Sequence, residues 1–459
     1  MRDPALIKKF IDILGADSVF DQESDLLTYS YDAAGLPGQA PWLAVRPRSL
    51  EQLGQTIKLC HLEGLPLTVR GAGTNLSGGA IPRPDGVVLL TSALKRIIEI
   101  NQADMYAVVE PGVVTAQFFA AAMAQGLFYP PDPGSQAVST LGGNVAENSG
   151  GLRGLKYGVT RDYVMGLSFF DSQGELVHTG ARTVKCVTGY NLAGLMVGSE
   201  GTLGVFGRII LKLIPPPAAA RAMVAMYERM QDASESVAAI IAARILPATL
   251  EFMDNFTIRT VEDYSQAGLP REAAALLLIE VDGHPAQVEE EAARVQEICR
   301  RHGAKVQVAQ DAAQRDKIWE ARRAAIPALA RLKPSIWLED ATVPRSQIPA
   351  MILSLTEIAA QHQLTIGTFG HAGDGNLHPT IVYDKRDPDQ RQRVAAAVEA
   401  IFERALALGG TLSGEHGLGL TKVRFLANEV GPATIAWSRR LKAALDPKGI
   451  LNPGKAIGG

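Results

Sequence analysis

The glycine-rich stretch at residues 130–164 constrains the fold of this chain more than any other segment. It reads PPDPGSQAVSTLGGNVAENSGGLRGLKYGVTRDYV. Its glycines and small polar residues include Gly142, Gly143, Gly150, Gly151, Gly154, Ser139, Thr140, Asn144 and Asn148. A loop of this length is uncommon in a compact domain unless it has a function. Bare backbone and small polar side chains suit a surface that contacts a long, flat, phosphate-bearing cofactor, so we expect a cofactor site here.

A second glycine-rich segment, RGAGTNLSGG at residues 70–79, follows the strand-like run LPLTV. Glycine permits positive φ and a close approach of ligand to backbone, and successive N–H groups can then hold an anion. With the polar side chains of Thr74, Asn75 and Ser77, the segment fits a loop that binds a diphosphate. It matches neither the Walker A sequence nor the GxGxxG turn of a Rossmann fold. Judged alone, an ordinary structural turn is the alternative.

Length and charge limit the classes of protein to which this chain can belong. The 459 residues predict two or three domains. Basic and acidic residues nearly balance, at 45 and 48, and no block of like charge occurs, which gives no support to nucleic-acid or anionic-membrane binding. The N-terminus has the pattern of a short amphipathic helix and not of a signal peptide, and no run is apolar enough to span a membrane. We expect a cytoplasmic protein, with docking on a membrane complex left open.

The cysteines carry no cofactor signature. Cys60, Cys186 and Cys299 lie far apart and none is part of a CxxC motif. This spacing indicates neither a disulfide framework nor a cysteine-based zinc or iron–sulfur site. We predict three buried thiols in a reducing compartment.

Three successive prolines, Pro215 to Pro217, predict a domain boundary because they end any strand or helix. Before them, β-rich runs alternate with turns and helical stretches such as SLEQLGQTIKLCHLEG, which predicts an α+β domain. After them, Ala-rich helical segments alternate with strands such as ALLLIEVDG and TIGTFGHAG, which predicts an α+β cap. We expect an N-terminal helical segment, a first domain, a cap domain and a C-terminal segment, at residues 1–40, 41–217, 218–410 and 411–459.

The segment HAGDGNLH, residues 371–378, has two histidines around a glycine-rich centre. The runs before and after it are strand-like, and Asp374-Gly375 favours a two-residue hairpin turn. This turn would pair His371 with His378 and place both imidazoles on one face, with Cβ atoms about 5 Å apart. That spacing suits two ligands of one metal. The alternative is a hairpin whose histidines bond each other or nearby backbone.

A third ligand is available in GEHGLG, residues 414–419, where Glu415 precedes His416. Two histidines and one carboxylate leave coordination positions open, which is typical of a catalytic metal site and not of a closed structural one. His416 has a side chain that accepts protons near neutral pH.

Five motifs occur in an order that resembles the flavin-binding oxidoreductases of the vanillyl-alcohol oxidase type: RGAGTNLSGG, PPDPGS with STLGGNVAENSGG, KYGVTRDYV, VKCVTGYNLAGLMVGSEGTLGV and LNPGK. Within them, the chain is similar to the D-lactate dehydrogenase and glycolate oxidase FAD-subunit branch, from Arg46 to Lys455. The resemblance implies an α+β fold: a two-subdomain FAD-binding domain of the vanillyl-alcohol oxidase or PCMH type, an α+β cap with an antiparallel sheet, and a C-terminal segment that returns to the flavin domain.

The resemblance also implies a set of cofactor contacts. FAD would be non-covalent, because the first loop has no histidine. The implied contacts are Arg70, Gly71, Ala72, Gly73, Thr74, Asn75, Gly78, Gly79, Pro131, Asp132, Ser139, Thr140, Gly142, Gly143, Asn144, Ala146, Asn148, Gly151, Tyr157, Gly158, Glu200, Gly201, Val205 and Asn452.

For the chemistry, the resemblance implies a divalent metal, zinc or else manganese or iron, bound by His371, His378 and Glu415, with His416 as the base. Arg322 matches an arginine that pairs a substrate carboxylate; its alternative is a solvated helix arginine. Two further candidates for the substrate pocket are Asn376 and Lys422, with turn and surface roles as alternatives.

These residues predict oxidation of a small D-2-hydroxy acid, D-lactate or glycolate, with hydride transfer to flavin N5. Apolar Ile326 and Leu338 stand where relatives that oxidise 2-hydroxyglutarate place polar side chains, which favours a small substrate. The alternatives are a D-2-hydroxyglutarate dehydrogenase, a flavin subunit inactive without its partners and, remotely, a nicotinamide-linked enzyme. Electrons would leave to a quinone, a cytochrome, an electron-transferring flavoprotein or an iron–sulfur subunit. A homodimer is left open.

Overall fold

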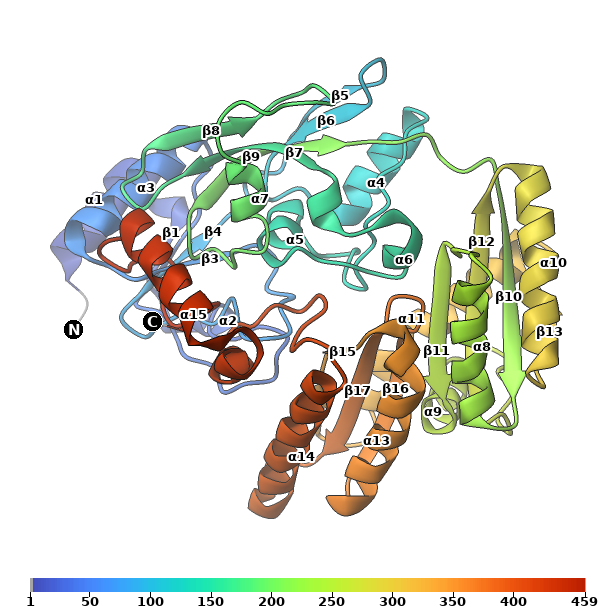
Figure 1. The fold of residues 1–459 in the computed structure, drawn as a ribbon. Helices are drawn as coiled ribbons and strands as arrows, with labels where there is room; N and C mark the ends of the chain where they lie inside the picture. Colours follow the sequence, from blue (N-terminus) through green and yellow to red (C-terminus); the bar gives the residue numbers. More distant parts are fainter. Residues whose placement is uncertain (1–2, 459) are drawn as a thin grey trace. The chain divides into compact units, whose positions relative to one another are not determined.

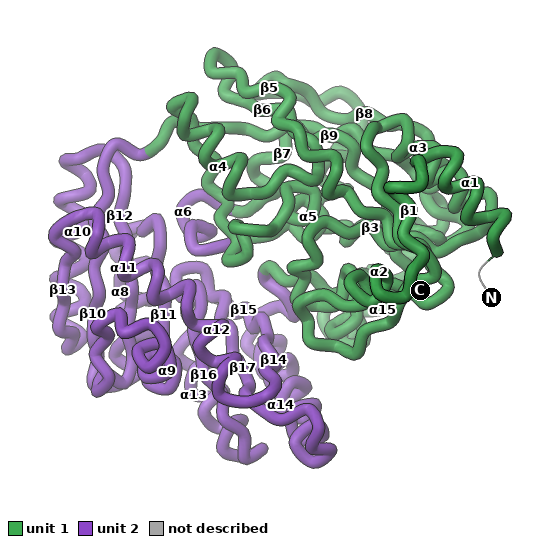
Figure 2. Tube along the Cα trace, turned by 180° about the vertical axis from the view of Figure 1, so that it is seen from behind, with its two compact units in different colours: residues 1–150, 159–216, 415–459 green, residues 151–158, 217–414 purple. Residues whose placement is uncertain are grey.

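The computed structural model describes residues 3–458 (Figure 1). The chain forms two compact units, shown in different colours in Figure 2. Unit 1 comprises Met1–Gly150, Val159–Pro216 and Glu415–Gly459, and unit 2 comprises Gly151–Gly158 and Pro217–Gly414. Unit 1 therefore ends its second segment at Pro216, and unit 2 begins its second segment at Pro217.

Unit 1 contains two sheets. The first has the order β1-β2-β4-β3, in which β2, β4 and β3 are parallel. The second has the order β5-β6-β9-β7-β8 and is antiparallel. The strands are β1 (Val19–Phe20), β2 (Leu43–Val45), β3 (Leu67–Arg70), β4 (Val87–Leu90), β5 (Ile97–Asn101), β6 (Tyr106–Val109), β7 (Val164–Phe170), β8 (Leu176–Gly180) and β9 (Val205–Lys212).

The helices of unit 1 include long and very short ones. They are α1 (Pro4–Leu14), α2 (Glu23–Thr28), α3 (Leu50–Glu63), α4 (Thr115–Ala124), α5 (Leu141–Glu147), α7 (Leu192–Met196) and α15 (Leu426–Leu445), with 3-10 turns η1 (Ala16–Ser18), η2 (Thr160–Asp162) and η4 (Val423–Phe425). The predicted amphipathic N-terminal helix is confirmed as α1, which begins after the N-cap Asp3 and buries Phe10 and Leu14.

Helix α3 shows how local sequence sets an element. The Ser49 side chain accepts a hydrogen bond from the N–H of Gln52 and so caps the first turn. Gly64, at φ 66°, ends the helix in the left-handed region, which suits glycine. Between the caps, Leu53 and Ile57 lie one turn apart and are fully buried in the core of the first sheet. The predicted helix is confirmed.

The end of the chain returns to the first sheet. The N–H of Leu67 donates to the carbonyl of Ile450 at 2.7 Å, and the N–H of Asn452 donates to the carbonyl of Leu67 at 2.8 Å. Leu451 thereby pairs with β3 in parallel. The Lys442 ammonium group bonds Leu451 O at 2.8 Å and holds this segment. The predicted return of the C-terminal segment is confirmed.

Unit 2 is built on one antiparallel sheet with the order β13-β10-β12-β11-β16-β17-β14, and β15 pairs with β17. The strands are β10 (Ala219–Tyr227), β11 (Thr249–Asp254), β12 (Ala275–Gly283), β13 (Lys305–Val308), β14 (Ser335–Leu338), β15 (Ala341–Thr342), β16 (Thr365–His371) and β17 (Asn376–Tyr383). The predicted cap with an antiparallel sheet, and with it the α+β fold, is confirmed.

Helices surround this sheet in Figure 1. They are α6 (Gly154–Tyr157), α8 (Met230–Ala242), α9 (Asn255–Ser265), α10 (Pro285–Arg301), α11 (Ala312–Arg323), α12 (Ala325–Ala330), α13 (Ile348–Gln361) and α14 (Pro388–Ala407), with η3 (Arg345–Gln347). Ile258 of α9 and Leu329 of α12 are fully buried in one core with Met253 and Phe369 of the sheet. Helices α9 and α12 therefore cover the sheet face that Met253 and Phe369 present.

The predicted register of the HAGDGNLH hairpin is wrong, because its turn holds four residues instead of two. The N–H of Gly375 donates to the carbonyl of His371 at 3.1 Å. Gly375 has φ 93°, and a methyl group there would collide with the carbonyl oxygen of Val343. The observed pairs are Phe369 with His378, Gly370 with Leu377, and His371 with Asn376. The two histidines are diagonal neighbours across the strands, not directly opposed.

Two further expectations need correction. The stretch at residues 130–164 is not one open loop, because short helices α5, α6 and η2 form within it. Cys60 and Cys299 are buried as expected, but Cys186 is exposed. The sequence around Cys186 has no long apolar periodicity that would have to be buried, so an exposed position costs little.

A matched pair of leucines in α3 tests the buried core of unit 1. Leu53→Ala removes a fully buried side chain, whereas Leu62→Ala changes a residue that is 65% exposed in the same helix. We expect Leu53→Ala to lower the free energy of unfolding by about 2–5 kcal/mol, and Leu62→Ala to change it by less than about 0.5 kcal/mol. Urea denaturation followed by circular dichroism measures both; equal losses would contradict the described packing.

Candidate active site

A buried carboxylate, Glu251 of β11, organises the polar residues of unit 2. Glu251 is fully buried. Its Oε2 accepts a hydrogen bond from Nε of Arg322 at 2.6 Å, and its Oε1 lies 2.6 Å from Nδ1 of His371. Burial raises the pKa of Glu251, but the charges of Arg322 and His371 outweigh it and hold the pKa below the ordinary value of 4.5. Glu251 is therefore ionised and fixes both partners.

The two hairpin histidines lie together. The ring centroids of His371 and His378 are 5.0 Å apart, with the planes nearly perpendicular. Both side chains are buried. Nδ1 of His371 meets the Glu251 carboxylate, so Nε2 is the ring nitrogen that would act as a metal ligand. A carboxylate on the second ring nitrogen is the usual support for a metal-binding histidine.

Arg322 is not the solvated helix arginine that the sequence left open. It is buried at the end of α11, and its guanidinium carbon lies 4.7 Å from the centroid of the Phe369 ring. Since Nε bonds Glu251, the two terminal NH2 groups of the same guanidinium can still pair a carboxylate in bidentate geometry.

Asn376 occupies the first position of β17, next to the histidines. Its side-chain NH2 group donates to the buried carboxylate of Asp340 and to Oγ1 of Thr342 at 2.6 Å. The hydroxyl of Ser413 donates to the other oxygen of Asp340 at 2.6 Å. Asp340 therefore anchors both the hairpin and residue 413.

Glu415 and His416 begin the last segment of unit 1, one and two residues beyond Gly414 of unit 2. The chain thus passes directly from the anchored Ser413 to these two residues. Nε2 of His416 lies 3.8 Å from Oε1 of Glu415. A methyl group at Gly150 would lie 2.7 Å from Oε2 of Glu415, so the glycine-rich stretch of unit 1 leaves room for this carboxylate.

In unit 1, the loop at residues 70–79 is held by its own side chains. Oδ1 of Asn75 accepts the N–H groups of Ser77 at 2.8 Å and Gly79 at 2.7 Å. The Arg70 guanidinium donates to the carbonyl of Tyr31 at 2.7 Å and lies against Gly73, where a methyl group would collide with it. Nδ2 of Asn75 is buried and has no hydrogen-bond partner within residues 3–458.

Asn452 joins three separate segments of unit 1. Its side-chain NH2 group donates to the carbonyl of Gly79 at 3.0 Å and to that of Glu200 at 2.6 Å. Asn452 itself follows the strand-like pairing with β3. The predicted contacts at Gly79, Glu200 and Asn452 are therefore neighbours through one buried amide.

The second glycine-rich stretch lies beside the first. Oγ1 of Thr140, which caps α5, occupies the space that a side chain at Gly71 would need. Ser139 and Asn144 share a buried network around the Thr115 hydroxyl, with distances of 2.9 Å to each. These side chains face inward, Gly142 is buried against Pro111, and Gly143 is only partly buried.

Not every implied cofactor contact lies in this group. Gly151, Tyr157 and Gly158 belong to unit 2, where the Tyr157 hydroxyl donates to Asp282 at 2.7 Å. Val205 is buried in the apolar core of the first sheet. Lys422, predicted for the substrate pocket, is 1% exposed in unit 1; burial raises the pKa of Glu200, and the charge of Lys422 opposes this rise in part. The remaining implied contacts lie in unit 1: Ala72, Thr74, Gly78, Pro131, Asp132, Ala146 and Asn148.

The sequence reasoning missed Glu251 and Asp340. Glu251 stands between Leu250 and Phe252 in the apolar run ATLEFMD, and a lone carboxylate in a buried strand requires a partner. That signal was present. Asp340, in WLEDATV, had only a weak signal, because a carboxylate at a strand end is usually exposed.

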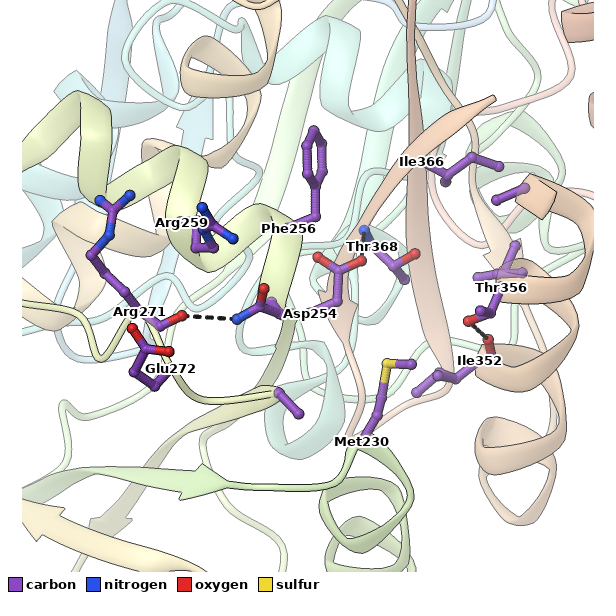
Figure 3. Close-up of a pocket in the computed structure, with 14 residues that line it drawn as sticks. Met230, Asp254, Phe256, Arg259, Arg271, Glu272, Ile352, Thr356, Ile366 and Thr368 are labelled. Atoms are coloured by element: carbon purple, nitrogen blue, oxygen red, sulfur yellow. Dashed lines mark hydrogen bonds between the residues drawn. The ribbon is translucent and has the colours of Figure 1, made fainter. Parts of the chain in front are cut away.

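Unit 2 also has a cavity of about 720 Å³ that contains none of the predicted residues (Figure 3). Asp254 lies in its wall and accepts the N–H groups of Thr257 at 2.8 Å and Thr368 at 2.7 Å. Burial raises the pKa of Asp254 to about 6, against these hydrogen bonds. Arg259 and Arg271 line the same cavity. Its lining has no cluster of the kind found around Glu251.

Two family models match the chain. One, described as the FAD binding domain, matches residues 41–180, and the other, the C-terminal domain of FAD linked oxidases, matches residues 216–456. The chain belongs to the FAD-linked oxidases. As a member of this family, it has an FAD-binding domain in the part of the chain that contains both glycine-rich stretches.

Relatives and solved structures agree with this family. The FAD-linked oxidase is 46% identical to the glycolate oxidase subunit GlcD of Bacillus subtilis over 449 residues, 98% of this chain and 96% of the relative. It is 33% identical to a D-lactate dehydrogenase of Anaerostipes hadrus, over 98% and 97%. A p-cresol methylhydroxylase structure matches with a TM-score of 0.83 at 18% identity, covering 99% and 96% of the two chains, which shows the fold. Over residues 3–458, no helix has the length and apolar character needed to cross a membrane.

Glu251→Gln tests the buried ion pair of this oxidase. At pH 7 the substitution leaves the buried Arg322 without its counter-ion, and we expect a loss of about 3 kcal/mol in the free energy of unfolding. Because the folded-state pKa of Glu251 is lowered, this stabilisation is present above the ordinary pKa of 4.5 and is lost as the pH falls through the folded value. Urea denaturation at several pH values measures the difference between wild type and variant.

The control is Glu289→Gln, which removes a carboxylate that is 63% exposed and paired with Arg221. We expect it to change stability by less than about 0.5 kcal/mol at any of these pH values. If both variants lose the same stability, or if the loss in Glu251→Gln does not shrink at low pH, Glu251 is not the ionised centre of this cluster.

Proposed function

We propose that this FAD-linked oxidase oxidises a small D-2-hydroxy acid, D-lactate or glycolate, to the 2-oxo acid. The observation that carries the proposal is the buried Glu251 carboxylate, which contacts both Arg322 and His371. This one carboxylate holds the guanidinium of Arg322 and the imidazole of His371, so that the guanidinium would pair a substrate carboxylate and Nε2 of His371 would serve as a ligand. A 2-hydroxy acid offers the carboxylate and the hydroxyl that such a pair would hold. The named activities of the relatives, glycolate oxidase subunit and D-lactate dehydrogenase, support the same substrate class.

The residues of unit 1 fit FAD. The buried Nδ2 of Asn75 has no hydrogen-bond partner within residues 3–458, and Oδ1 of Asn452 is also buried without one there. Both belong to segments that already share Gly79. Polar atoms of this kind need a partner, which non-covalent FAD would supply. When bound, FAD supplies a two-electron acceptor for the hydrogen on the substrate α-carbon.

The hairpin fits a divalent metal, zinc or else manganese or iron. His371, His378 and Glu415 would be its ligands. His371 has a carboxylate on its second ring nitrogen. Glu415 lies two residues after Ser413, which Asp340 anchors. Imidazole and carboxylate ligands suit these ions. When bound, the metal supplies Lewis-acid polarisation of the substrate hydroxyl.

The chain's own residues then divide the work. Arg322 pairs the substrate carboxylate and fixes its orientation. His416 accepts the hydroxyl proton. Asn376, held by Asp340 and Thr342, keeps the hairpin in place beside the substrate. Apolar Ile326 and Leu338 stand where relatives that oxidise 2-hydroxyglutarate place polar side chains, which supports a small acid over 2-hydroxyglutarate; Ile326 is 39% exposed in α12.

A second candidate function follows from the name of one group of relatives. GlcD is called a subunit of glycolate oxidase, so this chain would be a flavin subunit that needs partners for turnover. Electrons would then pass to an iron–sulfur subunit, a cytochrome, a quinone or an electron-transferring flavoprotein. Reduction of the bound flavin by the substrate, with no electron acceptor present, tests the first step of either function.

The purified protein, reconstituted with FAD, should absorb at about 450 nm, as bound oxidised flavin does. Anaerobic addition of glycolate or D-lactate should bleach this band, while L-lactate and D-2-hydroxyglutarate should bleach it slowly. Stopped-flow absorbance measures the rates. A protein that takes up no flavin, or whose flavin none of these acids reduces, would refute the proposal.

Two variants test the metal-ligand role of Glu415 and the base role of His416 separately. Glu415→Gln should lower the bound metal, measured by elemental analysis, and keep FAD; the exposed Glu429→Gln is its control. His416→Ala should keep FAD and metal but slow flavin reduction by about 10²–10⁴-fold, the usual contribution of a general base. Full metal content in Glu415→Gln would remove its role as a ligand, and an unchanged rate in His416→Ala would remove the base.

A further inference from the structure

The turn that follows His416 is fixed by a buried carboxylate of unit 1. Glu200 accepts the N–H groups of Leu418 at 2.9 Å and Gly419 at 2.7 Å. The residue before them, Gly417, has φ 75°. A methyl group at Gly417 would collide with Oε2 of Glu147 and would lie 3.2 Å from the carboxyl carbon of Glu200. Two carboxyl groups therefore occupy the space of a side chain at position 417.

Glu147 also borders the loop at residues 70–79. It is the last residue of α5. A methyl group at Gly79 would lie 3.2 Å from its Oε1, while its Oε2 faces Gly417. Oε2 is buried and accepts no hydrogen bond from any residue in the 3–458 range. One carboxyl group thus fills the gap between the first glycine loop and the turn after His416.

We propose that Glu147 is a positioning residue for His416: its carboxyl group, held between Gly79 and Gly417, sets the turn that carries the base. The proposal rests on the proposed role of His416. It assigns no contact between Glu147 and the substrate.

The charges around Glu147 indicate that it works as a neutral carboxylic acid. Burial, followed by repulsion from Glu200 and then from Asp32, raises its pKa well above the ordinary value, while the Asn75 side chain and the charge of Lys422 oppose this only in part. Burial also raises the pKa of Glu200, but the N–H groups of Leu418 and Gly419 stabilise its ionised form and oppose that rise. The two carboxyl groups titrate as a pair that carries one charge more readily than two.

This protonation state gives a stability test that does not depend on activity. Because the folded-state pKa of Glu147 is raised, the wild type loses stability as the pH rises above the ordinary value of 4.5. Glu147→Gln keeps the shape of the neutral acid and cannot ionise. We expect its urea midpoint to match the wild type near pH 4.5 and to exceed it by an increasing margin toward about pH 8.

The control is Glu51→Gln, an exposed position of α3. Its midpoint should follow the wild type at every pH. If Glu147→Gln is less stable than the wild type at high pH, or if its shift does not vary with pH, Glu147 is ionised in the folded protein and the neutral-acid role is overturned.

Flavin reduction tests the positioning role itself. Glu147→Ala should keep FAD absorbance but slow anaerobic reduction by about tenfold, the loss expected from a misplaced base, and Glu147→Gln should restore the rate. An unchanged rate in Glu147→Ala would overturn the proposal. If Glu147→Ala does not fold, Gly417→Ala provides the same test, with Gly449→Ala as control: both glycines have positive φ, but the space around Gly449 is open. A wild type that no acid reduces would refute the proposed function, while the stability test of Glu147 would stand.

Discussion

A buried negative charge at Glu251 sets the arrangement of the candidate site in unit 2. An isolated carboxylate in a protein interior is costly, and it is tolerated only with a close partner of opposite charge or strong donors. Arg322 and His371 meet this need from two different elements, a helix end and a hairpin. The same contacts orient a guanidinium and an imidazole. Stability of the cap and geometry of the site therefore depend on one interaction.

In unit 1, side chains hydrogen-bond to the backbone of several glycine-rich segments and hold these segments in place. Asn452 does this with two hydrogen bonds to carbonyl groups of distant segments, and Asn75 does it within its own loop. Glu200 extends the scheme to the turn after His416. Side-chain amides and carboxylates thus replace regular secondary structure as the support of this surface.

Much of this could be predicted from the sequence, because the strongest signals are local. The helical stretch SLEQLGQTIKLCHLEG predicted α3, and the long motifs predicted the flavin-binding fold. The cofactor contacts in both glycine loops stay predictions. The predicted hairpin register was wrong because the Asp374-Gly375 pair also fits a four-residue turn, in which Gly375 packs against Val343, a residue remote in sequence. Glu251 and Asp340 were missed because their partners come from other elements, and no local pattern encodes a partner.

The return of the chain end to β3 has a consequence for biosynthesis. Leu67 obtains two of its backbone hydrogen bonds from Ile450 and Asn452, which follow unit 2 along the chain. During translation the edge of the first sheet therefore stays unpaired while all of unit 2 is synthesised. Contacts between residues so distant in sequence form late, since the intervening chain must be ordered first. Until residues 450–452 are made, the strand edge at Leu67 stays open, and an open β-edge is prone to mispairing.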